Sequence, residues 1–290
     1  MGMDEARVSV PIPFYLLEHP DGVALFDCGL PAAMLDREES YLKALQTHDM
    51  DVTLAEDETV TSHLERLDID PAQVRYAVLS HLHFDHAGGL RELPNATVVV
   101  QRREWEAGFE PELSNRYGLR KRYFDLGHAV ELIDGEHDLF GDGSAVCVPS
   151  YGHTPGHQSL RVRSEQGDHL LIGDACYHCG VVESRVFPEM ADHAAMNRSL
   201  DALLASRGAE TVMVFGHDPA QWGDQPVLPN ARSASSNVGG ASVVPVSVPS
   251  IRRSSWSRPS ARRAGAPAGC RGSSRWRRSP CSSPCTSGRP

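Results

Sequence analysis

The densest group of potential metal ligands in the sequence lies in Ser80-His-Leu-His-Phe-Asp-His-Ala-Gly-Gly89. Histidine and carboxylate side chains are the common protein ligands of zinc and similar divalent ions. The apolar run Tyr76–Leu79 precedes the stretch, so we expect it at the C-terminal end of a strand. Gly88 and Gly89 are expected to let the backbone turn tightly beside the ligands. Four ligand-type residues fall within six positions: His81, His83, Asp85 and His86.

Three later segments carry further residues of the same type. His153 and His157 share the loop Gly152-His-Thr-Pro-Gly-His157, and this close spacing makes it difficult for both to bind an ion directly. Asp174 ends Ile172-Gly-Asp174, and His217 follows the predicted strand Thr211–Phe215. The sequence therefore spreads candidate ligands over four segments, most of them at the end of a predicted strand.

This arrangement resembles the metallo-β-lactamase superfamily, whose mark is His-x-His-x-Asp-His. The resemblance covers about residues 11–222. It implies an α/β fold of four layers, an αββα sandwich with two mixed sheets inside, helices outside and metals at one edge. It also implies two divalent metal ions, and we expect zinc from the histidine-rich set. The implied ligands are His81, His83 and His153 for the first ion, Asp85, His86 and His217 for the second, and Asp174 as a bridge.

Two further residues are expected to support the ligands. Asp27, in Leu25-Phe-Asp-Cys-Gly29, matches a family aspartate beside the metal loop and is expected to orient a ligand histidine. The alternative for Asp27 is a turn-forming residue before glycine. We expect His157 to be a structural histidine that is hydrogen-bonded within its own loop.

The segment Asp174-Ala-Cys-Tyr177 resembles the Asp-x-x-Tyr of N-acyl homoserine lactone hydrolases, the quorum-quenching lactonases. The resemblance implies a small-molecule lactone substrate, whose ring is opened by a metal-bridging hydroxide. Tyr177 and Asp85 are the candidate catalytic residues, and the alternative for Tyr177 is an aromatic residue of the core or rim. The phenol would stabilise the oxyanion, and Asp85 would relay a proton to the leaving oxygen. Further segments resemble the same family: residues 14–19, 100–105, 154–160 and 215–221.

Other functions remain open at this point. A glyoxalase II-like thioesterase or a phosphodiesterase would use the same metal motif, and a non-catalytic metal-binding module would keep the ligands alone. A true β-lactamase commonly alters the second-site ligands, and Asp174 with the Asp85-His86 pair argues against it. Cys176 and Cys179 have CxxC spacing without a second pair, so we interpret them as unpaired small residues.

Charge divides the chain into two parts. Residues 1–224 hold 17 Lys and Arg against 38 Asp and Glu, whereas the remainder holds 11 Arg and no acidic residue. We interpret residues 1–228 as the hydrolase domain. Residues 229–290, rich in Arg, Ser and Pro, are expected to be a disordered tail, because such a composition cannot bury enough surface. An alternative is that a shifted reading frame encodes this tail.

Composition also limits the partners and the compartment. The acidic domain would repel phosphates, so nucleic acid is not an expected partner, and only the basic tail favours one. No run approaches the length of a membrane helix, and the N-terminus has no signal core. Seven Cys without paired motifs favour a reducing cytoplasm. The family usually has a strand before the segment matching Pro11–Leu17. The sequence does not decide between a monomer and a homodimer.

Short apolar, β-branched runs predict strands, and helical spacing of apolar residues predicts helices at Val60–Leu67 and Met190–Ser206. The predicted strands are Phe14–Leu17, Val23–Phe26, Tyr76–Leu79, Thr97–Val100, Ala145–Val148, His169–Ile172 and Thr211–Phe215.

Overall fold

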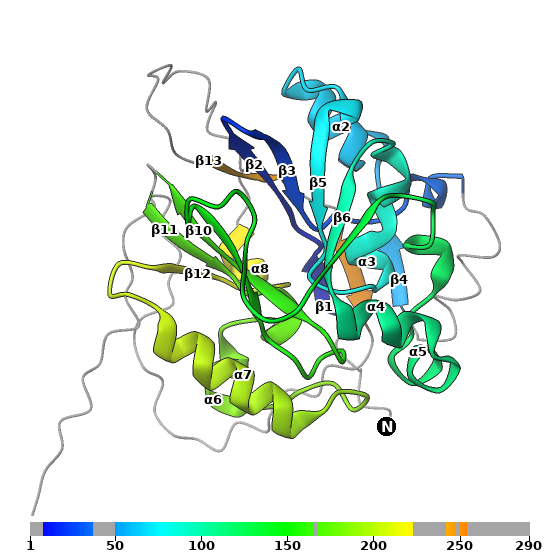
Figure 1. Cartoon of the computed structure of the whole chain (residues 1–290). Coiled ribbons are helices and arrows are strands. Elements are labelled where there is room, and N and C mark those ends of the chain that lie inside the picture. Colours follow the sequence, from blue (N-terminus) through cyan, green and yellow to red (C-terminus); the bar gives the residue numbers. More distant parts are fainter. Residues whose placement is uncertain (1–7, 37–49, 165–166, 223–241, 247–249, 254–290) are drawn as a thin grey trace, which may run out of the picture. The chain divides into compact units, whose positions relative to one another are not determined.

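The computed structural model describes residues 8–36, 50–164, 167–222, 242–246 and 250–253. The chain divides into two units, residues 1–256 and 257–290, and every described residue belongs to the first. That first unit contains two large sheets and one small sheet (Figure 1).

The larger sheet has six strands in the order β13-β2-β3-β5-β6-β7. β3, β5, β6 and β7 run parallel, whereas β2 and β13 join antiparallel at one edge. The bounds are β2 Phe14–His19, β3 Gly22–Phe26, β5 Val74–Val78, β6 Thr97–Gln101, β7 Val130–Ile133 and β13 Ser242–Val246.

The second sheet has five strands in the order β12-β11-β10-β9-β8, antiparallel except for the β11–β12 pair. Its bounds are β8 His137–Asp138, β9 Ala145–Pro149, β10 Gln158–Ser164, β11 Gly167–Leu171 and β12 Val212–Val214. A small sheet places β14 between β1 and β4, with bounds β1 Val8–Pro11, β4 Met50–Thr53 and β14 Ser250–Arg253.

The core shows how the layers stack. Successive side chains of a strand point to opposite faces, and β6 is buried on both. Val98 and Val100 pack under the helices, in one cluster with Leu64 of α2, while Val99 packs against the second sheet in a cluster with Leu160. A third cluster joins the outer face of the second sheet to α7. Four layers result, in the order helices, sheet, sheet, helices, which confirms the predicted αββα sandwich.

Most of the helices lie on the two outer faces, whereas Trp222 of the short α8 packs against the core between the sheets (Figure 1). Their bounds are α2 Val60–Arg66, α3 Phe84–Ala87, α4 Arg102–Phe109, α5 Pro111–Tyr117, α6 Gly180–Ser184, α7 His193–Ser206 and α8 Pro219–Trp222. Short 3-10 turns are η1 Ala32–Met34, η2 Glu56–Glu58, η3 Pro71–Gln73, η4 Gly88–Glu92, η5 Lys121–Tyr123 and η6 Gly173–Ala175. Within the described residues, no helix has the length and apolar character needed to cross a membrane.

All seven predicted strands are present, with ends that differ by a few residues. The second predicted helix begins at His193 rather than Met190, because Asp192 caps it by accepting a hydrogen bond from the Ala195 N–H at 2.9 Å. β10 was not predicted, because its sequence Gln-Ser-Leu-Arg-Val-Arg-Ser alternates polar and apolar residues and contains no apolar run.

The C-terminal segment differs from the expectation at two places. β13 and β14 both fall within residues 229–290, the segment expected to be a disordered tail. β13 pairs with the outer edge of β2, where an unpaired strand offers free backbone groups to any extended segment. Pro245 is compatible with this place because β13 is itself an edge strand. The remainder of the predicted tail lies outside the described residues.

Candidate metal centre

Loops at the ends of strands carry all the candidate ligands. The segment from His81 to His86 follows β5 and enters the short helix α3, and His153 lies in the turn between β9 and β10. Asp174 lies in η6, directly after β11, and His217 follows β12. Strands from both sheets therefore deliver their loops to one edge of the sandwich, as the sequence predicted.

The structure brings the seven candidate ligands together as two groups whose donor atoms lie within 4.8 Å of one another in each group. In the first group, His83 Nδ1 is 2.8 Å from His81 Nε2 and 3.1 Å from His153 Nε2. All of these side chains are buried or half-buried. The first group is His81, His83, His153 and Asp174, and the second is Asp85, His86 and His217.

Asp174 faces both groups with different oxygen atoms. Its Oδ2 lies 3.2 Å from His153 Nε2, in the first group. Its Oδ1 lies 3.0 Å from His217 Nε2 and 3.4 Å from His86 Nε2, in the second. Gly216 makes room for this carboxylate, since a Cβ there would lie 2.8 Å from Asp174 Oδ1. This placement suits a carboxylate that bridges two ions.

The Asp27 carboxylate contacts His86 at Nδ1, the ring nitrogen that does not face the other ligands. Its Oδ2 lies 2.8 Å from His86 Nδ1, and its Oδ1 accepts the Ser80 N–H at 2.7 Å. The carboxylate is an acceptor, so it places the imidazole proton on Nδ1 and leaves Nε2 of His86 free to bind an ion. Asp27 has a φ of +62°, a conformation that a non-glycine residue rarely adopts. We therefore infer an orienting role for Asp27 rather than an ordinary turn.

Backbone carbonyls orient two further histidines. The carbonyl of Tyr117 lies 2.6 Å from His83 Nε2, so Nδ1 of His83 is the atom left to bind an ion. The carbonyl of Pro11 lies 2.7 Å from His217 Nδ1, which leaves Nε2. Every residue has a carbonyl, so no sequence signal could have identified these two partners.

His157 lies outside both ligand groups and supports Asp174 instead. Its Nε2 accepts the Asp174 N–H at 3.0 Å, so Nδ1 must carry the proton that Ser150 Oγ accepts at 2.8 Å. Ser150 then donates to Ser159, 2.8 Å away, and Ser159 donates to the Ile172 carbonyl at 3.1 Å. This chain fixes the protonation of His157 and the position of the η6 turn. His157 is thus buried and structural, and its partner is the Asp174 loop as well as its own loop.

Tyr177 lies beside the first group. Its hydroxyl is 3.4 Å from His153 Nδ1, and its ring packs edge-on against His153 and His217. Backbone bonds join the two loops here, since the His217 N–H donates to the Tyr177 carbonyl at 2.8 Å. Asp85 lies at the opposite group, with Oδ2 3.9 Å from His86 Nε2. Tyr177 therefore contacts a histidine of each ligand group, whereas Asp85 belongs to the second group.

The electrostatics of the first group suit metal ligands. Burial, with neighbouring histidines, lowers the pKa of His81 well below its usual value, and burial and His153 lower that of His83 to about 3. Both imidazoles are therefore neutral, the form that binds a metal. Burial raises the pKa of Asp174, but His217, His86 and His153 outweigh this effect and lower it well below its usual value.

The residues present fit two divalent ions. Within the described residues, His86 Nε2 and Asp174 Oδ1 are buried and make no hydrogen bond, although each faces the middle of the site. A buried polar atom without a partner is costly, and an ion between these atoms would satisfy both. The nitrogen and carboxylate donors are of the type that zinc prefers, and manganese, cobalt or iron would also accept them.

Sequence reasoning missed one buried carboxylate close to the site. Glu104 is fully buried on α4 and accepts hydrogen bonds from the Leu82 and Gly156 N–H groups. Burial raises the pKa of Glu104 to about 7. The only signal was its place in Gln101-Arg-Arg-Glu-Trp105, a segment noted for its resemblance and not for its chemistry.

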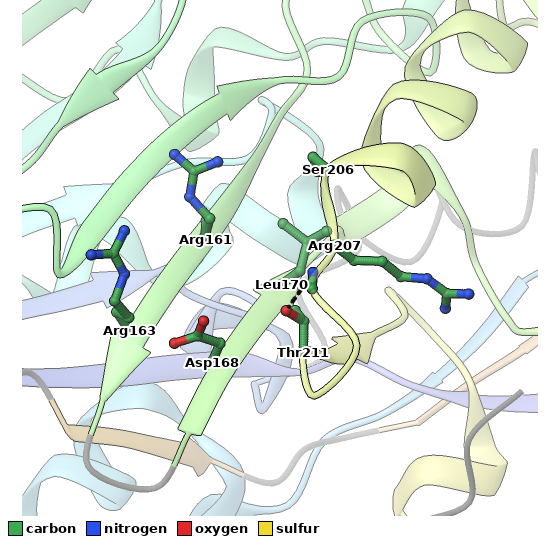
Figure 2. A pocket seen from close by; sticks show the side chains of 8 residues that line it. Arg161, Arg163, Asp168, Leu170, Ser206, Arg207 and Thr211 are labelled. Atoms are coloured by element: carbon green, nitrogen blue, oxygen red, sulfur yellow. Dashed lines mark hydrogen bonds between the residues drawn. The ribbon is translucent and has the colours of Figure 1, made fainter. Parts of the chain in front are cut away.

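A shallow pocket of about 270 Å³ lies away from the ligand groups, on β10, β11 and the end of α7 (Figure 2). Arg161 and Arg163 lie side by side there, whereas Arg207 points away from them. Arg161 also lies 3.7 Å from Glu136, which balances its charge. None of the candidate ligands lines this pocket, so it is separate from the metal centre.

Comparison with known proteins agrees with the fold. The family model of the metallo-beta-lactamase superfamily matches residues 10–217, and the chain belongs to this superfamily. The N-acyl homoserine lactonase AttM of Azorhizobium caulinodans is 35% identical over 227 residues, 75% of this chain and 85% of the relative. The N-acyl homoserine lactonase AiiA of Bacillus thuringiensis subsp. kurstaki is 30% identical over 217 residues, 74% of this chain and 84% of the relative.

Solved structures show the same similarity. A quorum-quenching N-acyl homoserine lactone lactonase is 30% identical with a TM-score of 0.62, covering 76% of this chain and 85% of its own. An N-acyl homoserine lactone hydrolase with N-hexanoyl-L-homoserine at its catalytic metal centre is 29% identical with a TM-score of 0.62, covering 76% and 86%. The chain is thus a member of a hydrolase superfamily with the donor set for a dinuclear centre.

Proposed function

We propose that this protein opens the lactone ring of N-acyl homoserine lactones, with two divalent ions as cofactors. The observation that carries the proposal is the pair of donor groups that share Asp174, with the Tyr177 hydroxyl 3.4 Å from His153 at their border. The relatives named as lactonases support the choice of substrate class, at 30–35% identity.

His81, His83 and His153 would hold one ion, Asp85, His86 and His217 the other, and Asp174 both. Bound there, two ions supply an acidified water as nucleophile and positive charge for the oxygen atoms that become negative. Asp27, Ser80 and the Pro11 and Tyr117 carbonyls would keep four of the five imidazoles, all except His153, in the binding tautomer.

Tyr177 and Asp85 carry the remaining steps. The Tyr177 hydroxyl would donate a hydrogen bond to the lactone carbonyl oxygen as this oxygen gains negative charge. Asp85 would receive the proton of the attacking water and pass it to the ring oxygen that leaves the carbonyl carbon. One water is consumed, and the products are a carboxylate, a free hydroxyl and one released proton.

A substrate panel tests the proposal with the full-length, zinc-loaded protein. Hexanoyl and decanoyl homoserine lactones would be compared with a glutathione thioester and a phosphodiester of p-nitrophenol. We expect the lactones to be hydrolysed with the highest kcat/KM, monitored by proton release and by the acyl homoserine product. Preferred hydrolysis of the thioester or the phosphodiester by protein with two bound ions would contradict the lactone assignment and leave the dinuclear site intact.

A further inference from the structure

Glu104 connects the two loops that carry the first ligand group. Its Oε1 accepts the Leu82 N–H at 3.1 Å, and its Oε2 accepts the Gly156 N–H at 2.8 Å. Leu82 lies between His81 and His83, and Gly156 is three residues after His153. One carboxylate on α4 therefore accepts hydrogen bonds from the backbone of both chain segments that carry the three histidines.

A steric contact supports the same connection independently. A Cβ at Gly156 would lie 2.3 Å from the Glu104 backbone nitrogen and 2.7 Å from its Cα. The His153 loop thus packs directly on the backbone of α4, where no side chain fits. Hydrogen bonds from Gln158 to Ser80 and Leu79 already join the ends of the strands. The Glu104 contacts therefore add a connection between the loops beyond these strands, which carry the ligands.

Charge and geometry explain why a carboxylate occupies this position. Both partners are N–H donors, so the side chain between them must accept twice. A carboxylate offers two acceptor oxygens, whereas the glutamine amide offers one oxygen and one NH₂ group. In glutamine the NH₂ group would face one of the N–H donors and push that loop away. Glutamine has the same size, so this substitution changes the bonding and little else.

We propose that Glu104 is a positioning residue that clamps the His81–His83 and His153 loops at the spacing at which three imidazoles share one ion. The inference rests on the dinuclear site of the proposed function but not on the lactone substrate. His83 Nδ1 lies 2.8 Å from His81 Nε2 and 3.1 Å from His153 Nε2, so a small shift of either loop would separate the donors. The second group has further supports that do not involve Glu104, since Asp27 contacts His86 and the Pro11 carbonyl contacts His217.

Cobalt binding tests the clamp without reference to substrate. Metal-free, full-length wild type and Glu104→Gln would be titrated with Co²⁺ at pH 8, where Glu104 is ionised. Loss of a partner behind the ligands commonly weakens metal binding about 10- to 100-fold. We expect one of the two Co²⁺ sites of the variant to weaken by that factor, with an altered visible absorption spectrum, while the other site changes less. Glu106→Gln is the matched control, because Glu106 is exposed on the same helix, and it should bind like wild type.

Glu104→Asp keeps two acceptor oxygens on a shorter side chain and decides the matter if Glu104→Gln does not fold. We expect its weaker Co²⁺ site to have an affinity between those of wild type and glutamine variant. Wild-type affinity and spectrum in Glu104→Gln, or an equal loss at both sites in either folded variant, would overturn the inference. Lactone hydrolysis is a separate readout: a clamp without lactonase activity would contradict only the substrate assignment.

Discussion

At the residue scale, the metal centre depends on acceptors that fix the proton of four of the ligand imidazoles. Ser80 Oγ lies 2.9 Å from Asp27 Oδ2 and 3.0 Å from His81 Nδ1, so it donates to the carboxylate and accepts from the histidine. Asp27 thereby influences His86 directly and His81 through Ser80. A single carboxylate behind the β5 loop thus orients one ligand of each group.

Replacing Asp27 with Asn is expected to weaken metal binding without unfolding the protein. Asn tolerates the positive φ of this position, so the backbone conformation is retained. Its amide lacks the second acceptor, and the Nδ1 proton of His86 loses its partner. We expect the affinity for metal to fall about 10- to 100-fold, mainly at the ligand group that contains His86. Zinc competition against a coloured chelator measures this loss, and unchanged affinity would contradict the orienting role.

Tyr177→Phe is expected to lower kcat for the lactone about 10- to 100-fold while both ions stay bound, because the substitution removes one hydrogen bond to a developing oxyanion. Metal analysis and steady-state kinetics of the same preparation would separate the two effects. Tyr76→Phe is the control, since Tyr76 lies on β5 and packs against Phe140, away from the ligands. A rate loss that tracks metal loss would argue against a role of the phenol in catalysis.

At the element scale, close packing rather than unusual dihedral angles explains the two glycines after the ligand motif. Gly88 and Gly89 were expected to allow a tight turn, yet they begin the 3-10 turn η4 without a positive φ. A Cβ at Gly89 would lie 2.2 Å from the Cys28 carbonyl oxygen, and one at Gly88 would lie 2.3 Å from Pro31 Cδ. The glycines let η4 approach the loop after β3, which also holds Asp27.

Gly89→Ala is therefore expected to cost roughly 1–3 kcal/mol or more in unfolding free energy, because the methyl group meets backbone atoms that cannot move independently. Gly127→Ala is the matched control. Gly127 has a φ of +86° and nothing within 4 Å of an added Cβ, so only the backbone penalty of about 1 kcal/mol applies. Urea unfolding measures both. If Gly89→Ala lowers the unfolding free energy no more than the control does, the structure accommodates the added methyl group and the close approach does not require glycine.

At the scale of the whole molecule, the predictable features are those coded by local patterns. Runs such as Thr97–Val100 predicted buried strands, and the dense histidines around Asp85 predicted the metal loop. The charged, alternating β10 and the acceptor carbonyls of Pro11 and Tyr117 were not predictable, because their roles depend on what the fold places beside them. Glu104 was missed for the same reason: its partners lie 22 and 52 residues away.

The C-terminal strands lead to a prediction about truncation. β13 covers the edge of β2, and β14 connects β1 to β4, while the Pro11 carbonyl of β1 holds His217. Removing residues 229–290 is expected to lower the unfolding midpoint by several degrees and to weaken metal binding, because it leaves these edges unpaired. Removing residues 257–290 alone should change the midpoint little. Scanning calorimetry compares the two truncations, and equal midpoints would show that β13 and β14 contribute no stability.

The dinuclear centre, with two ions bound by these seven side chains, is what we expect to make the protein a lactonase. Its most direct test is reconstitution: metal-free full-length protein would be titrated with Zn²⁺ while the opening of N-hexanoyl homoserine lactone is followed by proton release. We expect no turnover without metal and full turnover at two equivalents, with His81→Ala and His217→Ala inactive at that stoichiometry. Ring opening by metal-free protein, or two bound equivalents without ring opening, would contradict it.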